Sequence, residues 1–454
     1  MRNKEVNMLS GSIMKGLLTI AIPIMIMNVL QNVFSIIDMT ILKIYDTDGG
    51  YSVGAVGASG TLISLITGLL TGISAGANVI IARYIGKGDK DGVEKSVGTS
   101  VVFAFLGGVG LLVIGVVFAK VFLQLTNCPD ELLQQAVLYF RMYFIGVPIL
   151  MLYNFFAAIL RSSGDSTRPM VYLTLGGALK ILFSFLFVGI FNMGVIGVAL
   201  ATIISWLVSA VLAACALIFD GGTVKINFNR LKIYPKQLKE ILIVGVPTGM
   251  QAALYSLANV IITATVNSFG PDATTGISIA NQFDGILYNI SVAPSLAVMP
   301  YVSQNVGAHN INRAKAAIVK GMLITVALGA TFGALSAIFS AQLSSIMSDS
   351  PAVIAYSKQK MIIISSTYFI CGINEAVGAA LKGMGRPFIP MVCTMIYMCA
   401  IRFVWVYLIF PLVPNLTFLY LIWPIGWVLS IITILLFLFP TAKKLKLQFE
   451  NNQR

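Results

Sequence analysis

Charged residues and histidine are scarce in this 454-residue sequence. Asp, Glu, Lys and Arg together make up 10% of the chain, and His309 is its single histidine. No HExxH pair or nucleophile motif is present, and GKGD at 86–89 lacks the spacing and the following Ser or Thr of a phosphate-binding loop. These absences argue against hydrolytic enzymes and against ATP as an energy source. We predict a protein that is not an enzyme and that needs no cofactor.

Cysteine is also sparse, and its placement does not suit a disulfide framework. Of the five cysteines, Cys128 lies in a polar connection, and the others lie in apolar stretches at Cys215, Cys371, Cys393 and Cys399. No two have the spacing of a zinc site. We therefore predict neither a disulfide nor a bound metal.

Apolar residues fill the chain instead. They make up 57% of the sequence, with a mean hydropathy of +0.90. An apolar run of about 20 residues crosses a hydrocarbon core of roughly 30 Å as a helix. The sequence therefore predicts an all-α integral membrane protein with twelve transmembrane helices, centred on 16–42, 53–82, 97–123, 137–160, 169–191, 195–219, 241–267, 276–302, 318–341, 355–381, 389–410 and 419–440.

The second half of the chain repeats the first. Leu160-Arg161, Gly164 and Pro169-Met170-Val171 return at equal spacing as Leu381-Lys382, Gly385 and Pro390-Met391-Val392. An even number of spans in each half makes the two repeats parallel, related by a pseudo-two-fold axis along the membrane normal. We predict an N-lobe at 1–219, a cytoplasmic inter-lobe linker at 220–240 and a C-lobe at 241–454. Paired membrane repeats are how many transporters build an alternating-access pathway.

Basic residues indicate the orientation in the membrane. The formal net charge is +13, and most Lys and Arg fall in connections that lie on one side if both termini are cytoplasmic. The outer ends hold Lys43, Lys120, Arg141, Lys358 and Lys360. Because the charge is spread over short loops, a nucleic-acid partner is excluded. The basic linker suits either contact with an anionic membrane surface or a solvated connection.

Apart from the basic residues near the ends of the spans, five charged residues lie within the predicted spans, where each costs roughly 2.5–3.5 kcal/mol at the bilayer centre. They are Asp38, Lys180, Asp284, Glu375 and Arg402. Such groups normally face the protein interior or water, so we expect Asp284, Glu375 and Arg402 to form a polar site in the C-lobe. Because a buried Arg needs a partner, we expect Arg402 to satisfy one of these acids.

Polar stripes at helical spacing identify candidate cavity faces. The first span carries Asn28, Gln31 or Asn32, Ser35 and Asp38; the seventh carries Gln251, Tyr255 and Asn259; the eighth carries Asn281, Asp284 and Tyr288. We add Tyr153 and Asn154 as mid-span residues able to meet a lipophilic cation. Packing between helices is the alternative role for these aromatic residues.

Several motifs resemble one transporter family. They are an early span with Pro23 and Asp38, ANVIIARYIGKGD at 77–89, LRSSGDSTRP at 160–169, MGVIGVALATIIS at 193–205 and LKGMGRPFIP at 381–390. Because these motifs occur together with the six-plus-six repeat, the chain resembles a bacterial multidrug and toxic compound extrusion (MATE) transporter over nearly its whole length. The resemblance implies a two-lobed, V-shaped monomer in the inner or plasma membrane that exports amphipathic, often cationic compounds in exchange for protons or sodium ions.

In that family an acid at the position of Asp38 is the usual ion-coupling group. The fifth span departs from the family pattern, since many relatives carry Asn and then Asp or Asn four residues later, where this chain has Lys180 and Ser184. If this face points at Asp38, an ammonium replaces neutral oxygen ligands, which disfavours sodium. We hypothesise proton coupling through an Asp38–Lys180 pair.

The sequence thus predicts a secondary active antiporter that exports small amphipathic, cationic compounds in exchange for protons, with sodium as the alternative ion. Two other functions stay open. One is a flippase for lipid-linked precursors from the same wider superfamily, and the other is a membrane scaffold or passive pore. Three acids against two bases within the spans favour cationic or zwitterionic cargo over a pyrophosphate-bearing lipid.

Overall fold

A computed structural model describes residues 5–45, 51–126, 128–219 and 222–451. These ranges are almost entirely helical and contain no strand. Eleven helices in them are long and apolar enough to cross a membrane, and a helix pair bent by 45°, α11 (Pro351–Ser365) and α12 (Tyr368–Gly383), counts as a twelfth. That bent pair is the span predicted at 355–381. The prediction of an all-α membrane fold is confirmed.

The chain divides into two compact units. Unit 1 comprises Met1–Val6 and Val29–Gly249, and unit 2 comprises Asn7–Asn28 and Met250–Arg454. Two helices pass from one unit into the other, namely α1 (Ile13–Ile44) and α7 (Pro235–Asn267). The division into lobes at 219 and 241 remains a prediction.

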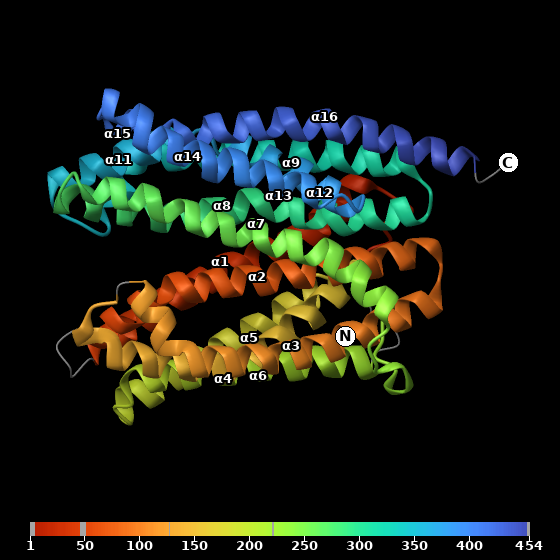
Figure 1. Ribbon diagram of the computed structural model, residues 1–454, viewed down its shortest axis with the longest axis horizontal. Helices are drawn as coiled ribbons and strands as arrows, with labels where there is room; N and C mark the ends of the chain where they lie inside the picture. The colour runs from red at the N-terminus through yellow and green to blue at the C-terminus, as the bar shows by residue number, and fades with distance from the viewer. Residues whose placement is uncertain (1–4, 46–50, 127, 220–221, 452–454) are drawn as a thin grey trace. The chain divides into compact units, whose positions relative to one another are not determined.

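Unit 1 is a bundle of long helices (Figure 1). Its own helices are α2 (Tyr51–Lys87), α3 (Lys90–Leu125), α4 (Asp130–Ser162), α5 (Thr167–Ser184) and α6 (Gly194–Phe219). The helix α4 packs against α2, α3 and α6, and α5 packs against α6. A π-helical turn, η1 (Phe185–Ile190), extends α5 directly after Ser184. Such turns are often found at functional sites.

Unit 2 is built in the same way, with α8 (Pro271–Gly307) packed against α9 (Ile311–Ile338), α11 and α12. Its fifth span is irregular, because α13 (Phe388–Cys393) and α14 (Ile401–Val404) are joined by the π-helical turn η3 (Thr394–Ala400) and followed by η4 (Trp405–Ile409). The remaining elements are α10 (Ser340–Ser345), the short turn η5 (Phe410–Leu412), α15 (Leu416–Tyr420) and α16 (Ile422–Asn451).

Corresponding turns of the two halves have the same geometry. Gly88 after α2 and His309 after α8 lie 221 residues apart, and both have positive φ, at 71° and 58°. The next residues, Asp89 and Asn310, each accept a hydrogen bond from a backbone N–H three residues later, at 2.9 and 3.0 Å. These side chains cap α3 and α9. The GKGD segment is therefore a turn and helix cap.

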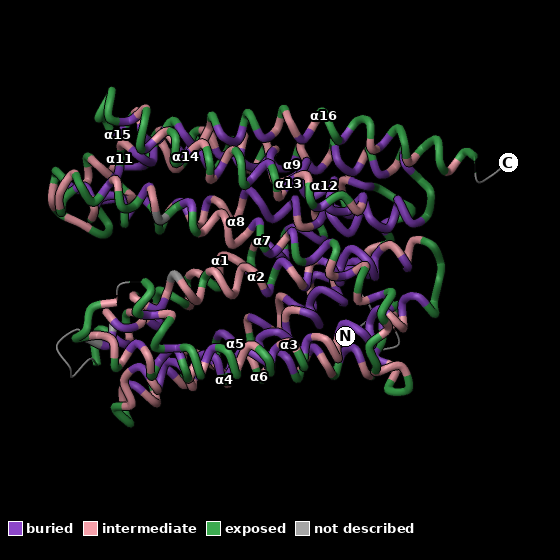
Figure 2. The backbone as a smooth tube through the Cα atoms, in the orientation of Figure 1, coloured by how far each residue is buried: buried purple, intermediate pink, exposed green. Residues whose placement is uncertain are grey.

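The outward faces of both units are apolar. On α3 the exposed side chains include Phe105, Val113 and Val117. Exposed stretches recur along α16 in Figure 2, where Leu436 and Phe439 lie. Water would oppose so much exposed apolar surface, whereas lipid tails accept it. The pattern is that of helices embedded in a bilayer.

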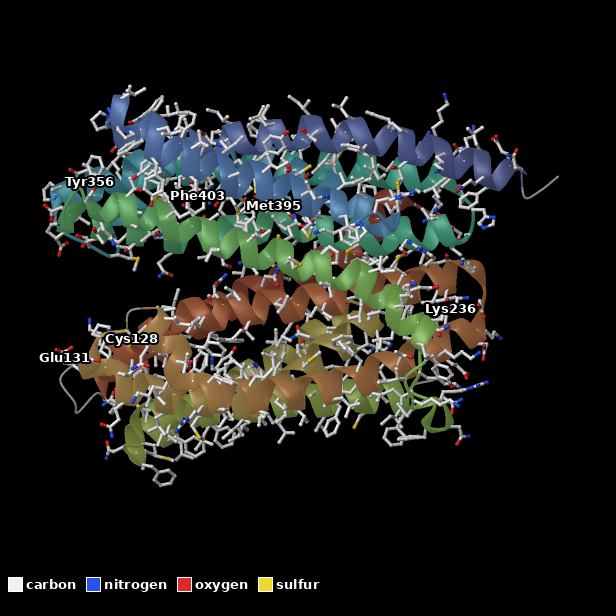
Figure 3. All side chains as sticks on the ribbon, in the orientation of Figure 1. Cys128, Glu131, Lys236, Tyr356, Met395 and Phe403 are labelled. Atoms are coloured by element: carbon white, nitrogen blue, oxygen red, sulfur yellow. The ribbon has the colours of Figure 1, made fainter. Side chains whose placement is uncertain are left out.

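The segment before α7 packs on the start of α3 within unit 1. It contains the short helical turn η2 (Phe228–Arg230). Arg230 forms an ion pair with Asp91 at 3.2 Å, and Asn227 donates a hydrogen bond to Glu94 at 3.1 Å. Figure 3 shows Lys236 at this end of unit 1, with Cys128 at the opposite end. The predicted linker is thus anchored to the N-terminus of a membrane helix.

Candidate functional site

The first charged cluster joins α1 to α5 inside unit 1. Asp38 is 4% exposed and forms an ion pair with the Lys180 ammonium. The Ser184 hydroxyl donates a hydrogen bond of 2.8 Å to the same carboxylate. Lys180 and Ser184 lie four residues apart on α5, so one helix face presents both groups to Asp38. The structure therefore brings together the three residues singled out for ion coupling.

Two consecutive glycines place α5 close enough for this cluster. A Cβ atom at Gly177 would lie 1.9 Å from the ring of Phe34 on α1, and one at Gly176 would lie 2.6 Å from the Ser205 carbonyl oxygen on α6. Only glycine permits such close approach on two sides of a helix. The position of Lys180 next to Asp38 thus depends on the close packing of Gly176 and Gly177, one helical turn before Lys180, against α6 and α1.

The remaining candidates of unit 1 differ in their surroundings. Gln31 and Ser35 are exposed on α1, and Asn32 is half-buried with a polar partner. The buried Tyr153 hydroxyl donates to the Pro169 carbonyl oxygen at 3.0 Å. Asn154 donates to the carbonyl oxygen of the preceding helical turn at 3.0 Å. The Tyr153 bond joins α4 to α5 and matches the helix-packing alternative, whereas the Asn154 bond lies within α4. Asn28, half-buried with a partner of its own, belongs to unit 2.

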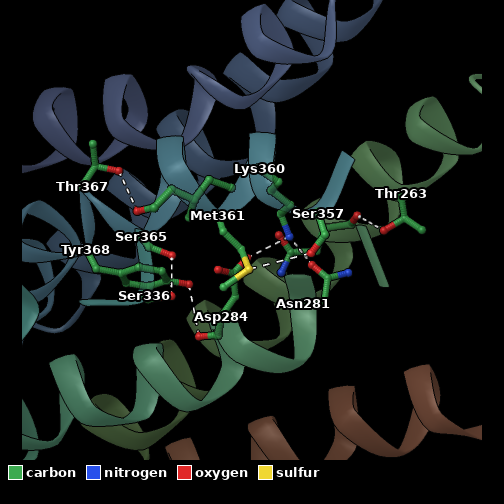
Figure 4. Close-up of polar contacts among 12 residues, drawn as sticks. Thr263, Asn281, Asp284, Ser336, Ser357, Lys360, Met361, Ser365, Thr367 and Tyr368 are labelled. Atoms are coloured by element: carbon green, nitrogen blue, oxygen red, sulfur yellow. Dashed lines mark hydrogen bonds and ion pairs between the residues drawn. The ribbon is translucent and has the colours of Figure 1, made fainter. Parts of the chain in front are cut away.

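A second charged cluster joins α8 to α11 inside unit 2 (Figure 4). Lys360 forms an ion pair of 2.8 Å with Asp284 and also donates to the amide oxygen of Asn281. Lys360 is 4% exposed and lies nine residues into α11. Its assignment to an outer end remains a prediction, and the structure adds that the charge is buried against protein and compensated by Asp284. The signal available in the sequence was its position inside the span predicted at 355–381.

Arg402 does not satisfy an acid, which corrects the expectation for this residue. Its Nη1 donates to the amide oxygen of Asn259 at 2.7 Å, and its guanidinium lies over the rings of Trp423 and Tyr255 at 4.9 and 5.7 Å. The Tyr255 hydroxyl accepts a hydrogen bond from Trp427 at 2.8 Å. Within the described residues, Arg402 has no carboxylate partner.

The predicted C-lobe polar site is therefore divided into separate parts. No hydrogen bond or ion pair connects Asp284, Glu375 and Arg402 with one another in the described ranges. Glu375 is half-buried on α12, and Tyr288 is half-buried on α8. Gln251 on α7 is buried, with its amide oxygen unpaired. Lys360 takes the role that had been expected of Arg402.

None of these clusters has the composition of a metal site. Among the described residues, no group of three or more His, Cys, Asp or Glu side chains could hold a metal ion. What the clusters provide is a carboxylate with an ammonium and a hydroxyl as partners in unit 1, a compensated acid in unit 2 and an arginine held by neutral groups. Such buried charges in membrane helices are typical of ion and substrate pathways.

Known proteins match the chain in both sequence and fold. The profile of the MatE family matches residues 23–186 and again 247–408, in agreement with the internal repeat. The probable multidrug resistance protein YoeA of Bacillus subtilis (strain 168) is 26% identical over 84% of this chain and 83% of its own. A protein of Shewanella oneidensis (strain MR-1) named as an FAD transporter is 24% identical over 85% of each chain.

A solved structure has the same fold over nearly the whole chain. This MOP superfamily transporter from Pyrococcus furiosus Vc1 superposes with a TM-score of 0.90 over 98% of this chain and 99% of its own, at 21% identity. The likeness confirms the two-lobe fold predicted from the repeat. The family profile covers well over half of the sequence, and the chain therefore belongs to the MatE family of multidrug efflux transporters.

Proposed function

We propose that this protein is a secondary active antiporter that exports small amphipathic compounds in exchange for protons by alternating access. The observation that carries the proposal is the buried carboxylate of Asp38, paired with Lys180 and hydrogen-bonded by Ser184. A carboxylate in this position can exchange a proton, and its charge decides how strongly α1 is held to α5. Membership of a multidrug efflux family supports small compounds as the cargo.

The ligands around Asp38 favour a proton over a sodium ion. Hard metal cations prefer several oxygen ligands and exclude cationic groups from their shell. Asp38 already has an ammonium as its neighbour, and Ser184 offers a single neutral oxygen. A sodium ion at this carboxylate would have to displace Lys180. A proton needs one carboxylate oxygen only.

Proton binding has a direct mechanical consequence. When Asp38 is protonated, its negative charge is lost and Lys180 is left without a counter-ion. Two unit charges 4 Å apart attract each other by about 4 kcal/mol at an effective dielectric constant of 20. Conformations that differ by a few kcal/mol exchange their populations when such an interaction is removed. We infer that protonation loosens α1 from α5 and that deprotonation restores the pair.

Transport by purified protein in lipid vesicles tests the coupling. A fluorescent amphipathic compound is loaded, and a proton gradient or a sodium gradient is imposed separately. We expect the proton gradient alone to drive transport, and Asp38→Asn to reduce the rate at least tenfold because the exchangeable carboxylate is gone. Lys180→Asn and Lys180→Arg should both shift the pH dependence, since each changes the cation next to Asp38.

Lys120→Asn is the matched control, because Lys120 is exposed near the end of α3 and lies outside the cluster. This variant should transport like the wild type. Transport driven by sodium would contradict the choice of ion. Wild-type pH dependence in both Lys180 variants would exclude Lys180 from coupling, and unchanged transport by Asp38→Asn would remove the site from the mechanism altogether.

Location and assembly are part of the same proposal. We propose that the protein is a monomer in the plasma membrane of a bacterium. Both termini are cytoplasmic, and the lipid bilayer surrounds the helices. The distribution of basic residues over the connections supports this orientation. Family membership does not fix the chemical class of the substrate, because relatives are named both as multidrug resistance proteins and as an FAD transporter.

A further inference from the structure

Arg402 is a buried cation, and no residue that the structure describes forms an ion pair with it. Its side chain is fully buried, and the described residues provide it with one hydrogen-bond acceptor, the amide oxygen of Asn259. Arginine stays protonated at any physiological pH. A buried charge that lacks an opposite charge is costly, so it persists in proteins mainly where it has a task.

The internal repeat offers a comparison for this arginine. In unit 1 the cation Lys180 of the fifth span is paired with the acid Asp38 of the first span. Arg402 lies 222 residues after Lys180, on the corresponding span of unit 2, and is hydrogen-bonded to Asn259 on the first span of that half. Because the family match begins at residue 23 in one half and at residue 247 in the other, Asn259 lies about one helical turn before the position that corresponds to Asp38. The cation of unit 2 therefore meets an amide where the cation of unit 1 meets a carboxylate.

The unpaired atoms of Arg402 form one edge of the guanidinium. Nη1 is bound to Asn259, whereas Nε and Nη2 are buried and have no hydrogen-bond partner in the described part of the chain. These two nitrogens carry the parallel N–H groups that bind both oxygens of a carboxylate in a bidentate pair. The rings of Trp423 and Tyr255 hold the flat group from its faces. The donors are therefore fixed in orientation before any ligand arrives.

We propose that Arg402 and Asn259 form a subsite for a carboxylate of the transported compound. The preferred cargo is then an amphipathic acid or zwitterion. This inference rests on the proposed export function and specifies its substrate class. Asn259 is exposed on α7, which makes it the outer member of the subsite. The π-helical turns η3 and η4 flank Arg402, and their altered backbone bonding allows this span to adjust around a ligand.

The charges of the other clusters agree with this cargo. The sequence suggested an excess of acids within the spans, but Lys360 adds a third base to Lys180 and Arg402 and compensates Asp284. Asp38 is likewise compensated by Lys180. A cationic drug would therefore find two of the three acids already paired, whereas an acidic group finds the free edge of Arg402.

A pair of matched dyes tests the subsite. One is a xanthene dye with a free carboxylate, and the other is its ethyl ester, which has the same cationic ring system. Binding to purified protein in phosphatidylcholine nanodiscs is followed by fluorescence polarisation. We expect the acid to bind more tightly than the ester. Arg402→Gln should weaken binding of the acid roughly tenfold to a hundredfold, the range for hydrogen bonds to a charged group, and leave the ester within about twofold.

Two further variants and a stability readout separate binding from folding. Arg402→Lys keeps the positive charge but loses the two parallel N–H donors of the guanidinium. Its affinity for the acid should therefore fall between those of wild type and Arg402→Gln. Arg141→Gln, at an exposed arginine of α4, should bind both dyes as the wild type does. Without dye, Arg402→Gln should melt at the same temperature or higher, because a buried unpaired charge is removed. The acid should raise the melting temperature of wild type only.

Three results would overturn the subsite. Equal affinity of the two dyes in wild type would remove the preference for an acid. An equal loss for acid and ester in Arg402→Gln, together with a lower melting temperature, would make Arg402 a structural residue. An acid preference that disappears when phosphatidylglycerol is added would assign the guanidinium to a lipid headgroup. Because these are binding measurements, they stand apart from the vesicle assay, in which failure of proton-driven transport refutes the coupling instead.

Discussion

At the scale of single residues, the spans differ in how their charges are neutralised. Asp38 has Lys180 and Ser184 as partners, and Asp284 has Lys360. Taking a charge out of water costs several kcal/mol, which the opposite charge repays only when both are present. Arg402 is stabilised by an amide and by aromatic faces instead. The basic side chains of Lys180 and Lys360 are therefore compensated by acids, whereas Arg402 has no acid partner among the described residues and can bind an external anion.

The Asp284–Lys360 pair gives a prediction for stability. Asp284→Asn and Lys360→Met should each lower the free energy of unfolding by roughly 3–5 kcal/mol, because each leaves one buried charge alone. The double variant should lose less than the sum of the two, since no uncompensated charge remains. Denaturant titrations in detergent micelles measure the four free energies of this cycle.

The pair formed by Lys446 and Glu450 on α16 is the control for that cycle. It has an N···O distance of 3.7 Å, and both side chains are about half exposed. Its coupling energy should stay below about 0.5 kcal/mol. A coupling between Asp284 and Lys360 as small as this one would show that the buried ion pair does not stabilise unit 2.

At the scale of helices, glycine decides how closely neighbouring spans approach. Gly176 faces α6 so tightly that a Cβ atom would lie 2.3 Å from Ser209 Oγ and 2.6 Å from the Ser205 carbonyl oxygen. A backbone carbonyl in a packed helix cannot rotate away as a side chain can. The lateral position of α5, and with it the placement of Lys180, depends on this contact.

Gly176→Ala should therefore separate α5 from α6 and lower the free energy of unfolding by roughly 1–3 kcal/mol. Melting temperatures in detergent measure the change. Gly110→Ala on α3 is the matched control, because nothing lies within 4 Å of a Cβ atom there. That substitution should leave the melting temperature equal or raise it, since alanine favours a helix. Equal stability of the two variants would show that α5 accommodates the methyl group.

At the scale of the whole molecule, the two halves share a repeated sequence and fold but differ in their buried charged residues. The family profile matches each half once, and the turns after α2 and α8 share positive φ values at equivalent positions. The halves differ where their charges lie. Unit 1 has an acid and a base between its first and fifth spans, and unit 2 has an amide and a base. We propose that the first pair couples ions and the second recognises substrate.

Topology gives a test at this scale. Cys128 should react with a membrane-impermeant maleimide on intact cells, because its connection is predicted to lie outside. In Cys128→Ser, a cysteine introduced by Lys236→Cys should react only after permeabilisation. The two positions lie at opposite ends of unit 1 (Figure 3). The single variant Cys128→Ser measures background labelling, and the reverse pattern of reactivity would invert the proposed orientation.

The sequence alone was sufficient for the family, the all-α membrane fold and the absence of enzymatic function, all of which are confirmed. These features depend on the length of apolar runs, on the repeat and on motifs such as LRSSGDSTRP, which are local properties of the chain. The spacing of i and i+4 places Lys180 and Ser184 on one helix face, and the resemblance to the family suggested that this face meets Asp38.

Only the tertiary structure decided which charges meet. Lys360 was placed at an outer end with no partner named, and Arg402 was expected to satisfy an acid. In the structure Lys360 forms an ion pair with Asp284, and Arg402 donates a hydrogen bond to Asn259. Pairing between distant spans depends on the rotation and depth of each helix, and these follow from packing contacts such as Gly176 against α6. Hydropathy records that a segment crosses the membrane, but it carries no information on which neighbour a buried side chain faces.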